Sequence, residues 1–345
     1  MNHFECDYTQ GAHPQIMEML VKTNMEQTTG YGEDIYCTKA ADLIKKKCSS
    51  PKSYVQFLVG GTQTNATVID ATLRPWQGVI SADTGHINVH ETGAIESDGH
   101  KVLAIKGENG KISADQVEEY CNIHEKDDSR EHTVQPAMVY ISNPTELGTL
   151  YSKEEIMKIS DICKKKNLLF FIDGARLGYG LMAQENDVML SDYAKYSDVF
   201  YIGGTKVGAL FGEAVVIQNE QLKVNFRYMI KQHGGMLAKG RLLGIQFLTL
   251  FQDDLYEKIA KNAVEQAVRL KKAFEEKKIK MFIDSPTNQQ FPILNKEQRD
   301  YLGQKNIFSL WEELDAQYCA VRFCTSWATT KEEIDELIAD INMLS

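Results

Sequence analysis

Short apolar runs alternate with amphipathic or polar stretches over the first two thirds of the chain. We expect helices at 62–73 and 152–167, of which the second is clearly amphipathic. Strands that are apolar along nearly their whole length, alternating with helices, are typical of a mostly parallel sheet covered by helices on both faces. The expected strands are 54–60, 78–83, 136–144, 167–176, 197–206 and 214–219.

The pattern changes at about residue 250, where helical segments begin to dominate. A further strand at 320–326 leads into a helix opened by Thr330, with Glu333 three residues on, which is a capping-box pattern. A chain of this length is expected to divide into more than one unit. We predict an N-terminal arm over 1–14 that packs near the functional site, a large domain over 15–249 and a small C-terminal domain over 250–345.

The composition is that of an ordinary globular protein: of 345 residues, 43% are hydrophobic and 25% charged. The net charge of −10 argues against nucleic acid or an anionic membrane as a partner. We see no signal peptide, and no apolar run approaches the roughly 20 residues of a membrane span. The seven cysteines form no CxxC pair, which favours reduced thiols in the cytoplasm.

Polar residues follow the predicted strands, where open α/β sheets bind ligands. The Gly-Gly-Thr stretch 60–62 precedes a helix whose N-terminal amides can hold a phosphate, although an ordinary turn is an alternative. Asp173 ends a buried strand, either as partner of a cationic ring nitrogen or in a salt bridge to Arg176 or a helix cap. Lys206 is either an amine nucleophile whose pKa burial lowers or the partner of a nearby carboxylate.

The order of these signals is more specific than any one of them. A phosphate-type turn, then an acid, then a lysine at the end of a following strand is the arrangement expected for pyridoxal phosphate. Its phosphate needs a helix N-terminus, its ring nitrogen an acid and its aldehyde a lysine. A residue that stacks on the ring is expected between the turn and Asp173, and His86 lies there; a purely structural histidine is the alternative.

Seven stretches give the chain a resemblance to the L-threonine aldolase (β-eliminating lyase) family of fold-type I pyridoxal-phosphate enzymes. They run in the family's order over nearly the whole chain, and DGAR together with GGTK-x-G is the most specific pair. The GGTK form resembles one divergent branch of the family. The matching stretches are 28–40, 57–65, 85–96, 142–152, 171–180, 202–216 and 321–330.

The resemblance implies an α/β fold of fold type I, with a mostly parallel seven-stranded sheet flanked by helices and a small C-terminal α+β domain. It implies that Lys206 binds the cofactor aldehyde as a Schiff base, that Asp173 holds the pyridinium charge, and that His86 stacks on the ring. Arg176 would contact the ring oxygen or the substrate carboxylate. No metal is implied. The phosphate would be bound by Gly60, Gly61, Thr62 and Thr205.

The resemblance also assigns contacts with an amino-acid substrate. Arg322 would clamp the substrate carboxylate with a pair of hydrogen bonds. His132 is a candidate second histidine beside the substrate hydroxyl. Cys6 and Asp7 would also bind the substrate. Cys6 stands where the family usually has a serine, before Asp7, that touches the substrate carboxylate. A thiol is a weaker hydrogen-bond donor, so substrate preference is expected to differ.

Two further positions imply an oligomer. Tyr31 and Lys231 fall where the family draws residues from a neighbouring subunit, although solvated surface side chains are the alternative. The resemblance implies a homotetramer, built as a dimer of dimers with active sites at the dimer interface.

The implied reaction is retro-aldol cleavage of L-threonine or L-allo-threonine, as β-hydroxy-α-amino acids, to glycine and acetaldehyde. The enzyme would be a carbon–carbon lyase of the low-specificity L-threonine aldolase type. His86, His132 or a water that they hold would take the hydroxyl proton. β-Elimination or racemisation on the same scaffold is one alternative. A non-catalytic binding protein is another, against which the intact set of Lys206, Asp173 and His86 argues.

Overall fold

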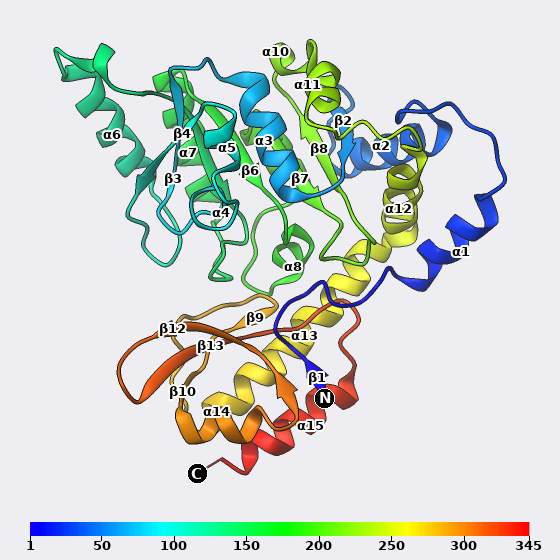
Figure 1. The fold of residues 1–345 in the computed structure, drawn as a ribbon, viewed down its shortest axis with the longest axis vertical. Coiled ribbons are helices and arrows are strands. Elements are labelled where there is room, and N and C mark those ends of the chain that lie inside the picture. The colour runs from blue at the N-terminus through cyan, green and yellow to red at the C-terminus, as the bar shows by residue number, and fades with distance from the viewer. Residues whose placement is uncertain (345) are drawn as a thin grey trace.

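A seven-stranded sheet forms the centre of the larger part of the molecule in the computed structural model, which describes residues 1–344 (Figure 1). The strand order is β2-β8-β7-β6-β5-β3-β4; β8 is antiparallel to both its neighbours, and the other pairs are parallel. This confirms the predicted mostly parallel sheet. The strands are β2 (Tyr54–Leu58), β3 (Gln77–Ala82), β4 (Lys101–Ile105), β5 (Gln135–Ser142), β6 (Leu169–Asp173), β7 (Val199–Gly203) and β8 (Glu213–Ile217).

Every expected strand of this sheet is present with small shifts at its ends, but β4 lies outside the expected set. It is an edge strand that pairs only with β3, and two of its five residues are buried. A strand with so little apolar surface carries a weaker signal in the sequence than the central strands, which are buried along nearly their whole length.

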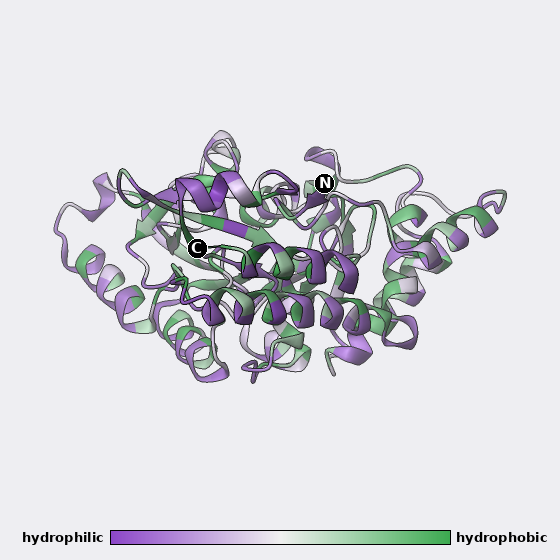
Figure 2. Ribbon diagram, turned by 90° about the horizontal axis from the view of Figure 1, so that it is seen from below, coloured by the Kyte–Doolittle hydropathy of each residue, from purple (hydrophilic) through white to green (hydrophobic). Residues whose placement is uncertain are grey.

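Helices cover both faces of the sheet because successive strand residues point to opposite sides. Met138 and Phe171 belong to one hydrophobic core. Their neighbours Val139 and Phe170 point the other way and belong to a second core. Purple and green segments alternate along the helices in Figure 2, as expected for helices with one hydrophilic and one hydrophobic face.

The helices around the large sheet include the two expected from the sequence, α3 and α7. Their bounds are α1 (Pro14–Thr23), α2 (Ile35–Lys47), α3 (Gly61–Thr72), α4 (His86–Val89), α5 (Ala94–Ser97), α6 (Ala114–Lys126), α7 (Lys153–Lys166), α8 (Leu177–Met182), α9 (Leu190–Tyr196), α10 (Glu220–Lys223), α11 (Phe226–Gln232) and α12 (Arg241–Phe251); short 3₁₀ helices span Arg130–His132 and Gln252–Asp254.

Helix α7 shows how local sequence sets these limits. Ser152 caps its first turn and Glu155 completes the capping box. Its last turn carries lysines 164–166, which interact favourably with the negative end of the helix dipole. Asn167 ends the helix in the left-handed conformation that asparagine tolerates.

The smaller part is an antiparallel sheet reached through the long helix α13 (Figure 1). The N-terminal strand β1 pairs in parallel with β11, so the chain starts beside this sheet. The capping box of Thr330 and Glu333 is confirmed at the start of α15. The elements are β1 (Asn2–His3), α13 (Leu255–Glu276), β9 (Gln289–Gln290), β10 (Ile293–Asn295), α14 (Lys296–Leu302), β11 (Asn306–Ile307), β12 (Ser309–Glu313), β13 (Tyr318–Cys324) and α15 (Lys331–Asn342). The domain limits at residues 14 and 249 stay a prediction.

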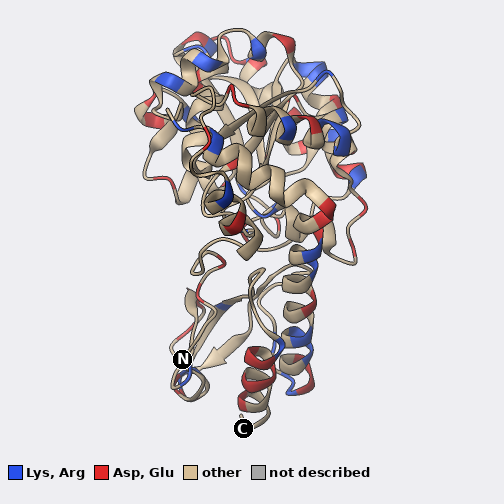
Figure 3. Cartoon of the chain, turned by 90° about the vertical axis from the view of Figure 1, so that its right-hand side faces the viewer, with Lys and Arg blue, Asp and Glu red and all other residues tan. Residues whose placement is uncertain are grey.

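Lys and Arg positions are interspersed with Asp and Glu positions along the helices drawn in Figure 3. Within residues 1–344, no helix combines the length and the apolar character that crossing a bilayer requires.

Candidate active site

A cavity of about 550 Å³ opens at the carboxyl edge of the large sheet. Ser142 and Asp173, the last residues of β5 and β6, are paired in register there, so neighbouring strands deliver their polar ends to one place. The small sheet closes another wall with Trp311 of β12 and Arg322 of β13. The lining residues are Tyr8, Val59, Gly60, Gly61, Thr62, His86, His90, Ser142, Pro144, Thr145, Glu146, Asp173, Ala175, Arg176, Tyr201, Thr205, Lys206, Phe211, Glu213, Trp311 and Arg322.

Asp173 is buried and held by neutral donors. Its Oδ1 accepts a hydrogen bond from the backbone N–H of Ala175 (2.9 Å). Its Oδ2 accepts from the Tyr140 hydroxyl (2.5 Å) and from Asn65 Nδ2 (3.3 Å). Burial, and then the charge of Asp173, raises the pKa of Tyr140 well above its ordinary value, so this hydroxyl stays a donor. The alternative of a salt bridge between Asp173 and Arg176 is wrong, because Arg176 pairs elsewhere.

His86 begins α4 and is tied to the same network. Its Nδ1 lies 2.7 Å from Glu91 Oε1, which also accepts from Asn65 Nδ2 at 2.7 Å. Burial alone would lower the pKa of His86, but the hydrogen bond to Glu91 and the charge of Asp173 outweigh it and raise the pKa. The ring is therefore fixed in orientation and holds its proton more firmly than an ordinary histidine.

Lys206 lies in the turn after β7, partly exposed to the cavity. Among the described residues no hydrogen bond or ion pair reaches its ammonium group. Burial, and then the positive charge of Arg176, lowers the pKa of Lys206 against the opposing effect of Asp7. The glycines before it pack against backbone: a Cβ on Gly203 would lie 2.2 Å from the carbonyl oxygen of Ala175. The turn thus holds Lys206 in place without satisfying its amine.

The stretch 60–62 begins the twelve-residue helix α3, whose N-terminus carries no side-chain cap. The first amides of a helix have no intrahelical partner, and they favour an anion. Space is limited, since a Cβ on Gly61 would lie 3.2 Å from the Tyr201 hydroxyl oxygen. Thr205 faces the same cavity, but its hydroxyl donates to Glu213 Oε1 (3.1 Å) and accepts from the Gly212 N–H (2.9 Å).

Arg176 and Asp7 form a buried two-point ion pair. Nε and Nη2 of Arg176 donate to Asp7 Oδ2 and Oδ1 at 2.7 and 3.0 Å. Asn288 also donates to Asp7, at 2.9 Å. The carboxylate of Asp7 thus positions Arg176, and neither Asp7 nor Cys6 is among the residues that line the cavity. Their contact with the substrate stays a prediction. No hydrogen bond among the described residues reaches Arg176 Nη1.

Arg322 extends into the cavity from β13. Its Nη1 donates to Gln289 Oε1 (3.3 Å) and its Nη2 to the carbonyl oxygen of Glu5 (3.1 Å). The guanidinium carbon lies 5.2 Å from the centre of the Trp311 ring. Its Nε is buried without a hydrogen-bond partner.

One predicted site residue lies elsewhere. His132 is exposed on the 3₁₀ helix before β5, whose opposite end, Ser142, reaches the cavity. The eight residues of β5 separate the two ends of the strand, roughly 25 Å at the usual rise per residue. The expectation that His132 lies beside the substrate hydroxyl is therefore wrong for this chain's own cavity.

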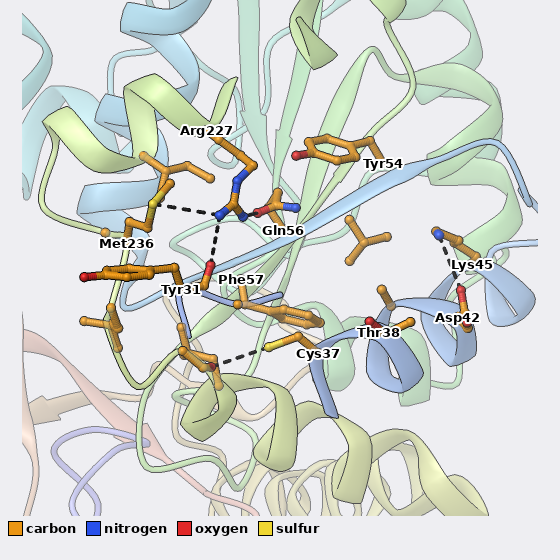
Figure 4. Close-up of a pocket in the computed structure, with 18 residues that line it drawn as sticks. Tyr31, Cys37, Thr38, Asp42, Lys45, Tyr54, Gln56, Phe57, Arg227 and Met236 are labelled. Carbon is orange, nitrogen blue, oxygen red and sulfur yellow. Dashed lines mark hydrogen bonds and ion pairs between the residues drawn. The ribbon is translucent and has the colours of Figure 1, made fainter. Parts of the chain in front are cut away.

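Tyr31 lines a separate pocket of about 200 Å³ that shares no residue with the cavity around Lys206 (Figure 4). Arg227 points toward Tyr31 and Gln56 in this pocket, and its Nη2 donates to the Tyr31 carbonyl oxygen at 3.1 Å. The ammonium of Lys231 lies 5.0 Å from the centre of the Tyr31 ring. Both predicted residues thus lie together, outside the cavity of their own chain.

The sequence reasoning missed several cavity residues. His90 lines the wall beside His86, with ring centres 5.6 Å apart. Glu213 is buried next to Thr205, and burial raises its pKa to about 8 against the opposing charge of Lys206. Glu146 lies on the loop after β5. Two features of the sequence could have indicated Glu146: it follows the end of a strand by four residues, and it lies within the matching stretch 142–152.

The fold defines a class of enzymes. The structure matches a double mutant of aspartate aminotransferase from Thermus thermophilus with a TM-score of 0.71 over 99% of this chain and 91% of that one. At 12% sequence identity this similarity shows the aminotransferase-like fold alone. The expected fold-type I architecture is thereby confirmed.

The family model described as beta-eliminating lyase matches residues 4–297, and the chain therefore belongs to the beta-eliminating lyase family. The structure of a threonine aldolase from Leishmania major is 42% identical, with a TM-score of 0.96 and 99% of both chains covered. A low specificity L-threonine aldolase from Pseudomonas sp. is 27% identical over 341 residues, which cover 98% of this chain and 96% of that protein. The resemblance seen in the sequence is confirmed.

Proposed function

We propose that the protein is a pyridoxal-phosphate-dependent carbon–carbon lyase that cleaves L-threonine and L-allo-threonine to glycine and acetaldehyde. The observation that carries this proposal is the unpaired amine of Lys206, in one cavity with Asp173 and His86. The same chain is similar throughout its length to proteins named threonine aldolase.

Three features of the cavity support pyridoxal phosphate as its cofactor. The lowered pKa of Lys206, caused first by burial, favours the neutral amine that attacks an aldehyde. Helix α3 presents free amides to a phosphate. Asp173 is a buried carboxylate without a cationic side-chain partner among the described residues, and a pyridinium nitrogen would supply the missing charge. When bound, the cofactor supplies an electron sink for negative charge at Cα of an amino acid.

The arginines of the cavity suit the substrate carboxylate. Arg176 is held rigidly by Asp7, and no hydrogen bond among the described residues reaches its Nη1. Arg322 lines the same cavity from β13. Guanidinium groups bind carboxylates with directed pairs of hydrogen bonds, so two of them at fixed positions orient the bound amino acid. Orientation selects the bond to Cα that breaks, which is a positioning effect.

The substrate class is tested with the purified protein, pyridoxal phosphate and a panel of amino acids. We expect glycine and acetaldehyde in equal amounts from L-threonine or L-allo-threonine. Pyruvate from L-serine as the main product would favour β-elimination instead, and D-alanine from L-alanine would favour racemisation. Either result without acetaldehyde from threonine would contradict the proposal.

Binding of the cofactor is tested without turnover. Borohydride reduction of the protein mixed with pyridoxal phosphate is expected to fix a phosphopyridoxyl group on Lys206, which peptide mass spectrometry locates. The variant Lys206→Ala is expected to lose the visible absorbance of the protein–cofactor complex. Labelling of a different lysine in the wild-type protein would contradict the assignment.

We propose further that the active unit is a homotetramer of the cytoplasm. Tyr31 is 46% exposed and pairs with Lys231 outside the cavity of its own chain, which fits a contribution to a neighbouring subunit's site. All seven cysteines are free and six of them are buried, which fits a reducing compartment.

A further inference from the structure

Glu146 is a carboxyl group of the cavity to which no role has been assigned. It lies on the loop after β5 and lines the cavity together with His86 and Lys206. The Ser142 hydroxyl donates to its Oε1 at 2.6 Å, and the backbone N–H of His86 donates to the same oxygen at 3.0 Å. Two bonds on one oxygen fix the direction of the carboxyl group.

The second oxygen of Glu146 is left for a ligand. Among the described residues no hydrogen bond from another residue reaches Oε2, and this atom does not belong to the buried polar atoms that lack a partner. An oxygen that is neither bonded nor sealed from the cavity is accessible to a group within it. Glu146 therefore offers a fixed carboxyl oxygen beside His86, on the wall where a substrate hydroxyl is expected.

The direction in which the pKa of Glu146 is shifted favours a role in proton transfer. Burial raises its pKa above the ordinary value of a glutamate, and the nearby charge of Asp173 adds to the rise. The hydrogen bonds from the Ser142 hydroxyl and from the backbone N–H of Glu146 itself, and the charge of His86, oppose it. A carboxyl group whose pKa is moved toward neutrality exchanges protons more effectively near pH 7. The other ionisable groups that line the cavity are His86, His90, Arg176, Lys206, Glu213, Tyr8, Tyr201 and Arg322.

The two histidines of the cavity are less suited to accept a proton. His86 has a raised pKa, although burial and then the charge of Lys206 oppose the rise, and its Nδ1 is engaged with Glu91. His90 has a lowered pKa, caused first by burial and then by the charge of His86, but it is exposed. Its ring lies 5.6 Å from that of His86, and no hydrogen bond or ion pair among the described residues holds its side chain. A base must be both unprotonated and positioned.

We propose that Glu146 accepts the proton of the substrate β-hydroxyl as the Cα–Cβ bond breaks, and returns it in the reverse reaction. This role rests on the proposed aldolase function. The O–H bond breaks, its proton passes to Oε2, and its electron pair becomes the second C–O bond of acetaldehyde. The electron pair of the Cα–Cβ bond stays with the Cα fragment, which takes up one proton to become glycine. No oxidation or reduction occurs.

The test compares Glu146→Gln with wild-type holoenzyme in two reactions. Glutamine keeps an oxygen for Ser142 and His86 but replaces the free oxygen with an amide that cannot take a proton. Cleavage of L-threonine requires removal of the hydroxyl proton, whereas exchange of the glycine α-proton with D₂O, followed by ¹H NMR, does not. We expect kcat for cleavage to fall by about 100-fold or more, while glycine exchange stays within about twofold of wild type.

Each outcome decides between the roles. If Glu146→Gln lost threonine cleavage and glycine exchange to the same extent, Glu146 would only maintain the structure of the site. If the variant cleaved threonine at the wild-type rate, another group would take the proton. Either result would overturn the proposal. Wild-type protein that exchanges glycine but releases no acetaldehyde would overturn the aldolase function itself and this role with it. The control Glu119→Gln changes an exposed glutamate of α6 and is expected to alter neither reaction.

A second variant tests the same carboxyl group without changing it. Ser142→Ala removes the donor that stabilises the charged form of Glu146. Its pKa is then expected to rise, so the acid limb of the pH profile of kcat/KM for threonine should move to higher pH. An acid limb that stays in place would contradict the role of Glu146, since no other group of the cavity depends on this hydroxyl as closely.

Discussion

Replacing Asp7 by asparagine separates the positioning of Arg176 from direct contact with substrate. Asp7 has no exposed side-chain surface, and Arg176 is 11% exposed. Two charge-assisted hydrogen bonds, of 2.7 and 3.0 Å, join them across the N-terminal segment and the start of α8. Asparagine keeps the size of the side chain but removes its charge and one acceptor oxygen.

The magnitude follows from the burial of the pair. Breaking a buried ion pair by removing one partner typically costs about 3–5 kcal/mol, because the remaining charge stays buried without compensation. We expect a loss at the lower end of this range, because Arg176 keeps some exposure to solvent and asparagine retains one acceptor oxygen. We therefore expect the free energy of unfolding of Asp7→Asn to fall by about 3 kcal/mol relative to wild type.

The effect also has a defined pH dependence. Burial alone would raise the pKa of Asp7, but the charges of Arg176 and Lys206 and the hydrogen bonds from Arg176 and Asn288 lower it below 3.8. A carboxyl group with a lowered folded-state pKa contributes stability that is present above its unfolded pKa. That stability disappears as the pH falls through the folded pKa. The stabilities of wild type and Asp7→Asn should therefore converge in acid.

Urea unfolding followed by circular dichroism at pH 7 measures this difference, with the slope of the transition checked for two-state behaviour. The matched control is Asp42→Asn, which breaks an exposed pair with Lys45 and should change the free energy of unfolding by less than about 0.5 kcal/mol. Steady-state assays should show a raised KM for threonine in Asp7→Asn, because Arg176 loses its support. If Asp7→Asn were as stable as Asp42→Asn and kept the wild-type KM, Asp7 would not be the residue that holds Arg176 in place.

Two further predictions concern His86 and the neighbouring subunit. Glu91→Gln removes the charge that holds Nδ1 of His86, so the pKa of His86 measured by NMR titration should fall; an unchanged value would show that Glu91 does not set it. Mixing inactive Lys206→Ala subunits with inactive Tyr31→Ala subunits should restore about a quarter of wild-type activity if they exchange at random. No recovery in hybrids that demonstrably form would mean that Tyr31 does not act across the interface.

Much of the fold could be read from the sequence because the central strands are buried on both faces. β5, β6 and β7 are nearly continuous apolar runs, and their limits follow from the polar residues at their ends. The edge strand β4 was missed because few of its residues face the core. Helix α15 was located from its capping box, a local signal that needs no tertiary context.

The candidate site could be predicted only where residues follow strand ends. Asp173 and Lys206 reach the same cavity because the carboxyl ends of parallel strands meet at one edge of the sheet. His132 is also a residue type that can transfer protons, but it precedes β5 and therefore lies at the amino edge of the sheet, opposite the cavity. The pairing of Asp7 with Arg176 joins residues 169 positions apart, and nothing local in either segment indicates it.

Glu146 illustrates the remaining difficulty. In the sequence it is one acidic residue in a polar loop, where a solvated side chain is the ordinary expectation. Its role becomes visible only when the folded chain brings the Ser142 hydroxyl and the His86 amide to one of its oxygens. The His86 amide is 60 positions from Glu146 in the sequence, so no short motif indicates this contact.

We propose that threonine is cleaved in the cavity around Lys206. The most direct measurement is acetaldehyde release from L-threonine and L-allo-threonine, followed with a coupled alcohol dehydrogenase, by wild-type protein and by Lys206→Ala, each supplied with pyridoxal phosphate. We predict acetaldehyde from wild type, faster with one diastereomer, and none above background from Lys206→Ala. Wild-type protein that releases no acetaldehyde from either, or a Lys206→Ala variant that retains full turnover, would contradict the account.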